Sequence, residues 1–244
     1  MISVCMASYN GEKFIRRQID SIISQLGPDD ELVISDDGST DSTCAIVESY
    51  RDPRIVLLHH KTPCGISANF ENAIVHARGD VIFLSDQDDV WLPNKIERVV
   101  LAFVESSAKV VHHSAVVVDP DDKVIHPSYT EYRGIRRGVL KNWIKASYLG
   151  CCMAFKREIL KDLLPFYKSR SMYFMHDDWV GLVGEINGGV CFIPDILMKY
   201  YRHGGNSSQL HGGDLKWKVL RRTLMARWIL SCLMRRFVRK MLSR

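Results

Sequence analysis

The sequence lacks most of the signatures that would place it at once in a functional class. Its seven cysteines include no Cys-x-x-Cys pair, so neither a zinc ribbon nor a dithiol redox motif is supported. Gly-x-Gly-x-x-Gly and Gly-x-x-x-x-Gly-Lys-Ser/Thr are both absent, which argues against a dinucleotide-binding fold and a P-loop nucleotidase. No apolar run approaches the roughly 20 residues of a membrane span. We expect no signal peptide and reduced cysteines packed in the core.

Negative charge is missing from the last part of the chain. Residues 215–244 contain ten Lys or Arg and no Asp or Glu, whereas the whole chain has a net charge of +5. Residues 1–214 therefore carry a net charge of −5. A basic tail on an acidic body indicates that only the tail meets an anionic surface, and it argues against nucleic acid as a partner.

What the sequence does contain is a regular alternation of apolar strands and amphipathic helices. The pattern predicts strands at 3–8, 31–35, 54–59, 81–84, 110–118, 150–155, 190–193 and 197–201, and helices at 12–25, 94–106 and 176–186, with others ending near 50, 76 and 164. Such alternation predicts parallel βαβ units and a mostly parallel central sheet flanked by helices. Residues 120–142 are poorly periodic, and we expect a mobile surface segment there.

The stretch from Val81 to Asp89 is the most informative one. Four apolar residues, 81–84, predict a buried central strand, and Asp86-Gln87-Asp88-Asp89 follows it. Ligands of open α/β sheets bind just beyond the carboxyl ends of such strands. Three carboxylates in four residues repel one another unless a cation neutralises them, and Mg²⁺ and Mn²⁺ prefer carboxylate oxygen. We interpret this loop as a metal site that carries a phosphate group; the alternative is a solvated acidic turn that caps the next helix.

A second carboxylate cluster follows the strand predicted at 31–35. Asp36-Asp37-Gly38-Ser39-Thr40-Asp41 places two carboxylates at a strand tip, with a glycine turn and several candidate helix caps. We interpret Asp36 and Asp37 as ligand-binding residues; a plain capping turn is the alternative.

Histidines and tryptophans near these clusters have less specific explanations. His59-His60 and His112-His113 resemble metal pairs, but neighbouring residues of a strand point to opposite faces, so we expect both pairs to be structural. His176 is expected to support the site rather than to react. Trp179 is either a core residue or an aromatic that stacks on a sugar acceptor.

Four motifs occur in the order in which they occur in inverting family-2 glycosyltransferases, and the chain resembles that family over about residues 1–208. They are Tyr9-Asn10-Gly11, Asp36-Asp37-Gly38-Ser39-Thr40-Asp41, Asp86-Gln87-Asp88-Asp89 and His176-Asp177-Asp178-Trp179. The resemblance is closest to the bacterial branch that builds surface polysaccharides such as O-antigen and capsule, often described as rhamnosyltransferases. It implies a GT-A fold, which we assign to residues 1–213. Residues 214–244 are predicted from their own charge and spacing to form a basic amphipathic helical tail.

The resemblance also implies a UDP- or dTDP-sugar donor, a glycan acceptor and a divalent metal, Mn²⁺ or Mg²⁺. The implied donor-binding residues are Ser8, Tyr9, Asn10, Glu12, Asp36, Asp37, Asn69, Asp86, Gln87, Asp88, Arg202 and His203. Asp86 and Asp88 match the Asp-x-Asp motif that holds the metal, and Asp177 matches the general base. Asp178 replaces the usual aromatic of this branch, so Asp178 could share or take over the base role. The Tyr-Arg-x-His pattern of the branch is shifted by one position at Arg202-His203.

Elementary chemistry is consistent with these roles. A carboxylate can accept the N3–H of uracil or thymine. A metal on the diphosphate neutralises charge that develops on the leaving group. Inversion by a single displacement needs one base and no covalent nucleophile.

A phosphohydrolase is the rival hypothesis. Asp86-Gln87-Asp88-Asp89-Val90 fits the Asp-x-Asp-x-Val loop of haloacid-dehalogenase-like phosphatases. That loop normally follows the first strand, whereas three predicted strands precede it here. The rival also gives Asp36 to Asp41 no role.

The tail combines apolar and basic residues at helical spacing. Its apolar stripe contains Trp217, Leu220, Leu224, Trp228, Leu230, Leu233, Met234, Phe237 and Met241. Because Arg227 interrupts the longest apolar stretch, we predict an interfacial helix with tryptophan anchors on an anionic membrane, rather than a span. This predicts a peripheral enzyme on the cytoplasmic face of the cell membrane, with an acceptor carried on a polyprenyl-diphosphate lipid. The alternative is a helix packed on the catalytic domain or on a second subunit of a homo-oligomer.

Overall fold

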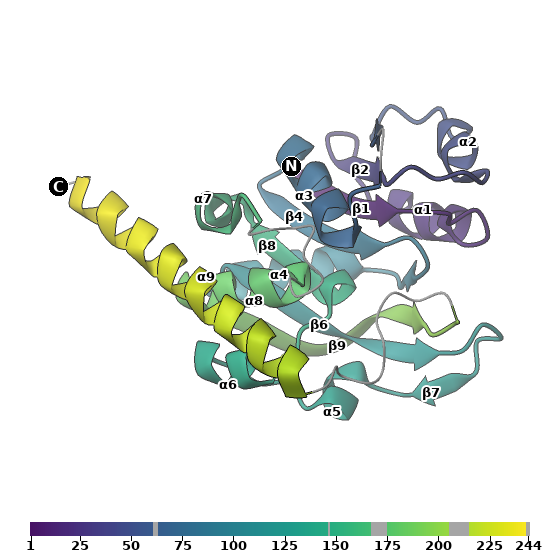
Figure 1. Ribbon diagram of the computed structural model, residues 1–244. Coiled ribbons are helices and arrows are strands. Elements are labelled where there is room, and N and C mark those ends of the chain that lie inside the picture. Colours follow the sequence, from purple (N-terminus) through teal and green to yellow (C-terminus); the bar gives the residue numbers. More distant parts are fainter. Residues whose placement is uncertain (61–62, 146, 167–174, 205–214, 243–244) are drawn as a thin grey trace.

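A computed structural model describes residues 1–60, 63–145, 147–166, 175–204 and 215–242 (Figure 1). The strands are β1 (Ile2–Ser8), β2 (Glu31–Asp36), β3 (Ile55–His59), β4 (Val81–Asp86), β5 (Val90–Trp91), β6 (Val110–Val118), β7 (Val124–His126), β8 (Met153–Lys156) and β9 (Val190–Tyr201). The helices are α1 (Ile15–Ile23), α2 (Thr43–Glu48), α3 (Ile66–His76), α4 (Lys95–Glu105), α5 (Tyr129–Arg133), α6 (Val139–Ile144), α7 (Leu160–Leu163), α8 (His176–Ile186) and α9 (Leu215–Leu242). Two 3₁₀ turns, η1 (Gly150–Cys152) and η2 (Arg157–Ile159), flank β8.

The described strands form one sheet in the order β3-β2-β1-β4-β8-β6-β9-β5, and β7 pairs with β6. The first four strands are parallel, as the sequence predicts, whereas β8 runs antiparallel to both β4 and β6. In this register Ser8 of β1 lies beside Asp36 of β2, and Ala7 lies beside Asp86 of β4. Three carboxyl strand ends therefore meet at one edge of the sheet, which is where open α/β sheets bind ligands.

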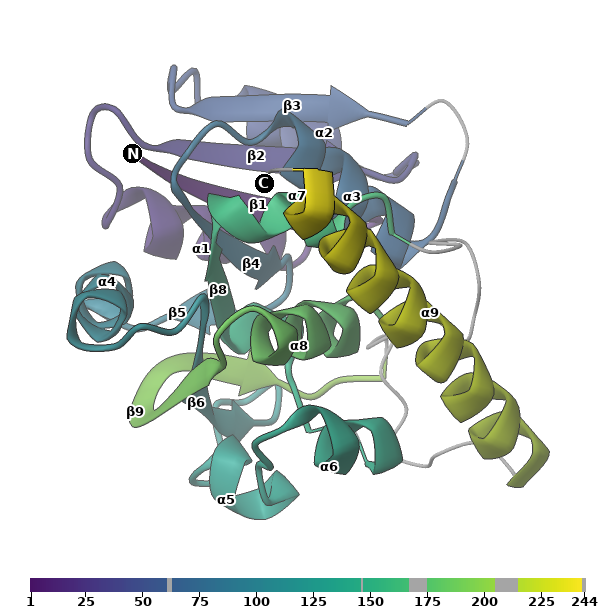
Figure 2. The same ribbon diagram turned by 90° about the vertical axis from the view of Figure 1, so that its left-hand side faces the viewer.

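Helices cover both faces of the sheet (Figure 2). Because side chains alternate along a strand, Val4 and Met6 of β1 enter the core beneath α1 and α4, and Cys5 and Ala7 enter the core beneath α3 and α8. Both cores are closed by apolar residues at helical spacing, such as Ile15, Ile19 and Ile22 on α1. The sheet is thus the middle of three layers.

Two strand predictions are wrong in detail. The strand predicted at 150–155 begins only at Met153, because Gly150–Cys152 form the turn η1 against α8; a Cβ on Gly150 would lie 2.9 Å from Nε2 of His176. The two closing strands predicted at 190–193 and 197–201 are one strand, β9. Pro194 interrupts the apolar pattern. It lies where the pairing with β6 shifts register, so the missing N–H of this proline removes no hydrogen bond between the strands.

Residues 120–142 are more ordered in structure than expected. They contain β7, α5 and the start of α6, and Ser128 caps α5 by accepting a hydrogen bond from the amide of Glu131. The first helix also begins later than predicted, at Ile15, because the Glu12 amide donates to Asp41 and the Phe14 amide to the Gly11 carbonyl.

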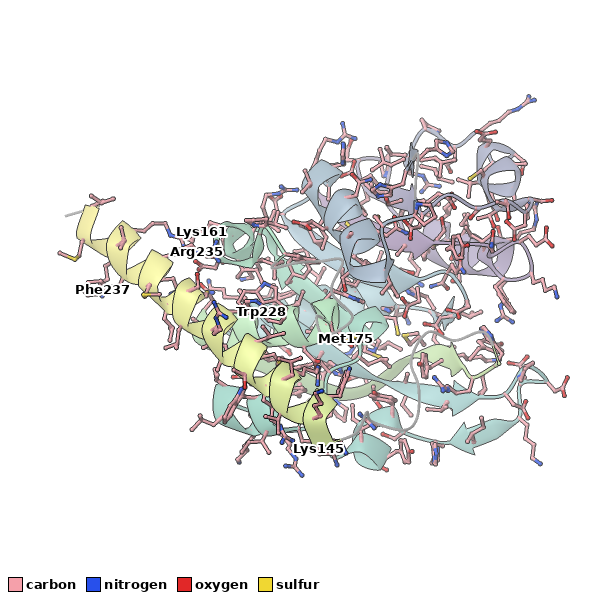
Figure 3. All side chains as sticks on the ribbon, viewed as in Figure 1. Lys145, Lys161, Met175, Trp228, Arg235 and Phe237 are labelled. Carbon is pink, nitrogen blue, oxygen red and sulfur yellow. The ribbon has the colours of Figure 1, made fainter. Side chains whose placement is uncertain are left out.

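The tail is one helix, α9, and it packs on the domain. Met225, Trp228 and Cys232 are buried in the same core as α3 and α8, and the Trp143 indole donates to the Arg222 carbonyl at 2.8 Å. Figure 3 shows Trp228 between α9 and the body, with Phe237 farther along the helix, where it extends past the body. Trp228 is therefore a core residue and not the membrane anchor that its spacing predicts.

In its outer part α9 is also held by charge. Arg236 and Arg239 both form ion pairs with the buried Asp162. Among the described residues, no helix combines the length and the apolar character that crossing a membrane requires.

This packing predicts unequal costs for two aromatic truncations on α9. Trp228→Ala empties a core position and should lower the free energy of unfolding by about 3–5 kcal/mol. Phe237→Ala removes a side chain that is 65% exposed, so its effect should stay within about 0.5 kcal/mol. Urea unfolding of both variants measures the difference; equal midpoints would mean that α9 does not pack on the domain.

Candidate active site

The tip of β2 is built as a saturated turn. Oδ1 of Asp36 accepts the amides of Gly38 and Ser39 at 3.1 and 2.7 Å, and Oδ2 accepts the hydroxyl of Ser8 at 2.9 Å and that of Ser39. Asp36 is 1% exposed. Its carboxylate therefore holds the turn together and joins β2 to β1, a structural role that the capping alternative anticipates.

Asp37 fixes the segment that leads into α3. Its Oδ1 accepts the amide of Cys64 at 2.7 Å, and its Oδ2 accepts the amide of Gly65 at 2.9 Å. On α3, the Asn69 amide group donates to the Ser8 carbonyl at 3.1 Å. The Asn69 Oδ1 atom is buried and has no hydrogen-bond partner in the described part of the chain, which leaves one acceptor next to the strand tips.

The Tyr9-Asn10-Gly11 loop is held from both sides. The Gln87 side chain accepts the Tyr9 amide and donates to the Tyr9 carbonyl, both at 2.9 Å, as a neighbouring strand would. A Cβ on Gly11 would lie 2.1 Å from Oε1 of Gln87, so this clamp requires glycine there. Asn10 and Glu12 accept the amides of Thr40 and Ser42, which ties the loop to the start of α2. The Tyr9 ring is left half exposed at the edge.

Beyond β4 the carboxylates crowd together. Single ligand atoms of Asp86, Asp89 and Cys151 lie within 4.8 Å of one another. Burial, together with the negative charges of Asp88 and Asp177, raises the pKa of Asp86 to about 7. Burial and the negative charges of Asp88 and Asp86 raise the pKa of Asp89 well above its usual range, and Asp89 accepts the Tyr201 amide at 3.2 Å.

Lys95 and Arg17, two cations that the sequence did not predict, lie next to these carboxylates. Lys95 is fully buried; its Nζ donates to the Cys151 carbonyl at 2.8 Å and lies 4.0 Å from the centre of the Trp91 ring. Burial lowers the pKa of Lys95 to about 8. Arg17 donates to the Asp88 carbonyl at 2.8 Å, with its guanidinium 3.8 Å from the centre of the Tyr201 ring.

Gln18 is a third residue that sequence reasoning missed. It is fully buried and donates to the hydroxyl of Ser85 and the carbonyl of Asp86. Its signal was present in the sequence, since Gln18 is a polar residue on the apolar face of α1.

Asp88 meets the segment that follows β9. Its Oδ2 lies 2.9 Å from Nε2 of His203, whose ring stacks on Phe14 with 4.6 Å between centroids. Arg202 instead donates to the Tyr200 hydroxyl at 3.0 Å. The predicted loop continues beyond Gly204 into residues 205–208, which lie outside the described residues.

The N-terminus of α8 brings the fourth motif to the same edge. His176 stacks on Phe70 with 4.2 Å between centroids, and burial lowers its pKa to about 3, so it supports the site as a neutral ring. Asp177 is partly exposed and packs against η1, and burial raises its pKa. Asp178 is buried and forms an ion pair with Arg221 of α9. Trp179 is 2% exposed and donates to the Leu163 carbonyl, so it belongs to the core.

The two rings of each histidine pair have different neighbours. His112 accepts the Leu149 amide at 3.1 Å while His113 contacts the Ser114 carbonyl at 2.7 Å, and burial keeps the pKa of both rings far below the usual range. His59 lies near Asp36 and Cys44, and His60 lies near Asp37 and Cys64. Neither pair therefore offers two rings to one ion.

A sequence model described as "Glycosyl transferase family 2" matches residues 3–164. Three relatives are a glycosyltransferase of Nostoc sp. (29% identity, 84% of this chain and 66% of the relative), WfgD of Escherichia coli (26%; 90% and 85%) and TuaG of Bacillus subtilis (31%; 91% and 85%). WfgD is named as a UDP-Glc:α-D-GlcNAc-diphosphoundecaprenol β-1,3-glucosyltransferase, and TuaG is named for teichuronic acid biosynthesis.

Two solved structures share the fold. They are S. aureus TarS 1-349 in complex with UDP-GlcNAc (TM-score 0.68, 20% identity) and mannosyltransferase PcManGT from Pyrobaculum calidifontis in complex with GDP-Man and Mn²⁺ (TM-score 0.63, 21% identity). The matches cover 86% and 96% of this chain, and the chain spans 61% and 64% of theirs. The expected GT-A fold is confirmed, and the phosphohydrolase alternative receives no support.

Proposed function

The chain belongs to the family-2 glycosyltransferases, and we propose that it transfers a sugar, with inversion, from a UDP- or dTDP-sugar to a glycan acceptor of a bacterial surface polysaccharide. The observation that carries this proposal is the shared edge of β2, β1 and β4. It places two carboxylate clusters next to each other, and the N-terminus of α8 brings Asp177 to the same edge. Its relatives include enzymes of polysaccharide synthesis.

The nucleotide end of the donor is assigned to the tips of β1 and β2, where Ser8, Tyr9, Asn10, Glu12, Asp36, Asp37 and Asn69 lie. Among the described residues, Oδ2 of Asp37 accepts one backbone amide, from Gly65, and a second lone pair of this oxygen can accept the N3–H of a uracil or thymine ring. The half-exposed Tyr9 ring offers a stacking face. Asp36 is assigned an indirect role in nucleotide binding, because its hydrogen bonds hold the turn at residues 36–39. The UDP-Glc in the name of WfgD supports a UDP-sugar.

The metal is assigned to Asp88 and Asp86, with Gln87 and His203 beside them. These residues fit a hard divalent cation: Asp86 and Asp88 are carboxylates, they repel each other, and Asp88 already faces the imidazole of His203. A Mn²⁺ or Mg²⁺ ion held by Asp86 and Asp88 would neutralise charge on the leaving diphosphate. Arg17 holds the loop in place by donating to the Asp88 carbonyl. Arg202 precedes His203 in the chain, and we assign it to the diphosphate of the donor as well. The Mn²⁺ complex of PcManGT supports this assignment.

Asp177 is assigned as the general base. Asp178 is buried and paired with Arg221, whereas Asp177 is partly exposed and its charge acts on Asp86 at the end of β4. Asp177 takes the proton of the acceptor hydroxyl while that oxygen bonds to the anomeric carbon. The bond to the diphosphate breaks on the opposite side, so one displacement inverts the centre.

The outer face of α9 is assigned to an anionic membrane surface, with the acceptor on a polyprenyl-diphosphate lipid. Its exposed apolar residues are Leu230, Leu233, Met234, Phe237, Val238, Met241 and Leu242. Arg227 and Lys240 are exposed on the same helix, and such a mixture favours the interface of an anionic leaflet. Diphosphoundecaprenol in the name of WfgD supports a lipid-linked acceptor.

Asp88→Ala should abolish metal-stimulated nucleotide binding, because it removes the carboxylate that faces His203. The measurement is calorimetric titration of UDP and dTDP with and without Mn²⁺. Asp80→Ala is the matched control, since Asp80 precedes β4 at the other end of the strand and is exposed. Unchanged binding by Asp88→Ala would remove the metal assignment.

Asp177→Asn should lower kcat by about 10²–10⁴ and leave donor affinity nearly unchanged, because the amide keeps the shape and loses the basicity. Initial rates with the donor that gives the largest metal-dependent thermal shift measure this, and NMR of the product anomer tests inversion. If Asp178→Asn alone shows that pattern, the base is Asp178.

Replacing Phe237 and Met241 together by Ser should weaken binding to phosphatidylglycerol vesicles by about tenfold or more, because two exposed apolar side chains are lost. Val104→Ser, at a 77% exposed position on α4, is the control, and co-sedimentation is the measurement. Point variants are sharper than removing residues after 213, which would also uncover the core around Trp228. Undiminished co-sedimentation, or a dimer that the variant dissociates, would contradict the membrane assignment.

A further inference from the structure

We propose that Arg221 of α9 is a positioning residue for the catalytic carboxylate: its ion pair holds the Asp178 side chain toward α9 and leaves the neighbouring Asp177 as the base. The inference rests on the proposed function for its consequence in turnover. Its structural basis is an ion pair between two segments far apart in the sequence.

The pair lies in a closed setting between α8 and α9. The side chains of Arg221 and Asp178 are 17% and 8% exposed. Beside them is a cavity of about 10 Å³, room for about one water molecule, lined by Asp178, Trp179, Arg221, Met225 and Trp228 among others. The Arg221 guanidinium also lies 5.3 Å from the centre of the Trp217 ring. Asp178 is thus neutralised by protein rather than by solvent.

Two adjacent carboxylates at one helix terminus make this cation necessary. Burial and the charge of Asp177 raise the pKa of Asp178 to about 7, and Arg221 opposes that rise for both residues. Arg133 of α5 acts in the same direction from farther away. Three other titratable groups lie near the pair. Asp86 of β4 adds negative charge near Asp177, and His176 is neutral. Tyr148 lies near Asp178, but its hydroxyl donates to Glu185. Without Arg221 the pKa of both carboxyl groups would rise further, so the pair would keep its proton to a higher pH.

Helix attachment does not explain the pair. The Arg222 guanidinium already donates to the Ile144 carbonyl, Arg236 and Arg239 grip Asp162, and Met225, Trp228 and Cys232 supply the apolar contact. A buried ion pair also contributes little net stability compared with apolar packing. In the part of the chain that the structure describes, Arg221 is the cation that forms an ion pair with the neighbour of the base.

The test compares Arg221→Gln with Arg222→Gln, which loses an anchor of the same helix one residue away. The rate of nucleoside diphosphate release from the donor is followed from pH 5.5 to 9. A base must be deprotonated, and loss of Arg221 raises its pKa. The acidic limb of the Arg221→Gln profile should therefore move up by about one pH unit, a roughly tenfold loss below the limb, with rates converging above it. Arg222→Gln should keep the original limb.

Removing the second carboxylate as well should reverse the effect. In Arg221→Gln combined with Asp178→Asn, Asp177 has no charged neighbour on its helix, so the limb should return toward its original position. A uniform loss at every pH, with a lower melting temperature, would reduce Arg221 to a structural role and overturn the proposal. An unmoved limb would also overturn it.

A second readout separates this inference from the proposed function. Carboxyl ¹³C NMR titration of the aspartates, assigned with the Asp177→Asn and Asp178→Asn variants, needs no donor. Arg221→Gln should raise the titration midpoints of both residues. If the protein turned over no nucleotide sugar, the proposed function would fail while this titration still decided whether Arg221 controls the pair.

Discussion

The structure depends above all on how it accommodates concentrated negative charge in a poorly hydrated edge of a sheet. Asp86 ends β4, Asp88 and Asp89 follow it, and Asp177 and Asp178 lie in the first turn of α8. Burial raises the pKa of Asp86, Asp89, Asp177 and Asp178, and neighbouring carboxylates add to the rise at Asp86, Asp89 and Asp178. Lys95, Arg17 and Arg221 are the internal cations that make this arrangement tolerable, and they come from three different helices. Packing of α1, α4 and α9 is therefore tied to the electrostatics of the edge.

The carboxylates at this edge divide into buried and partly exposed ones. Asp36 accepts three hydrogen bonds from its own turn and one from Ser8 of β1, and Asp178 pairs with Arg221. Oδ2 of Asp88 lies 2.9 Å from Nε2 of His203, and Asp88 and Asp177 both keep partial exposure. The carboxylates to which we assign the chemistry are those that keep partial exposure at the edge.

The order of apolar and polar residues along the chain was enough to predict the elements whose formation depends mainly on neighbouring residues. The apolar run at 81–84 and the alternation of strands and helices were enough for the parallel half of the sheet, and the motifs brought Asp86, Asp88 and Asp177 to one edge. The turn η1 and the continuous strand β9 escaped prediction, because Gly150 and Pro194 are set by packing on α8 and by the register with β6. Lys95 and Arg221 gave no sequence signal, since their partners are distant in the chain.

The role of the α9 tail could also not be predicted from its sequence pattern alone. An amphipathic helix has one pattern whether its apolar stripe meets lipid or protein, and α9 meets protein through Trp228 while Phe237 stays exposed. From Arg221 to Met241 the helix is unbroken, a rod of about 30 Å at 1.5 Å per residue. A partner that binds the outer end of α9 and tilts the helix would also move the Arg221 guanidinium at its inner end. Binding outside the domain would then change the pKa of the Asp177–Asp178 pair, because one rigid helix connects the two places.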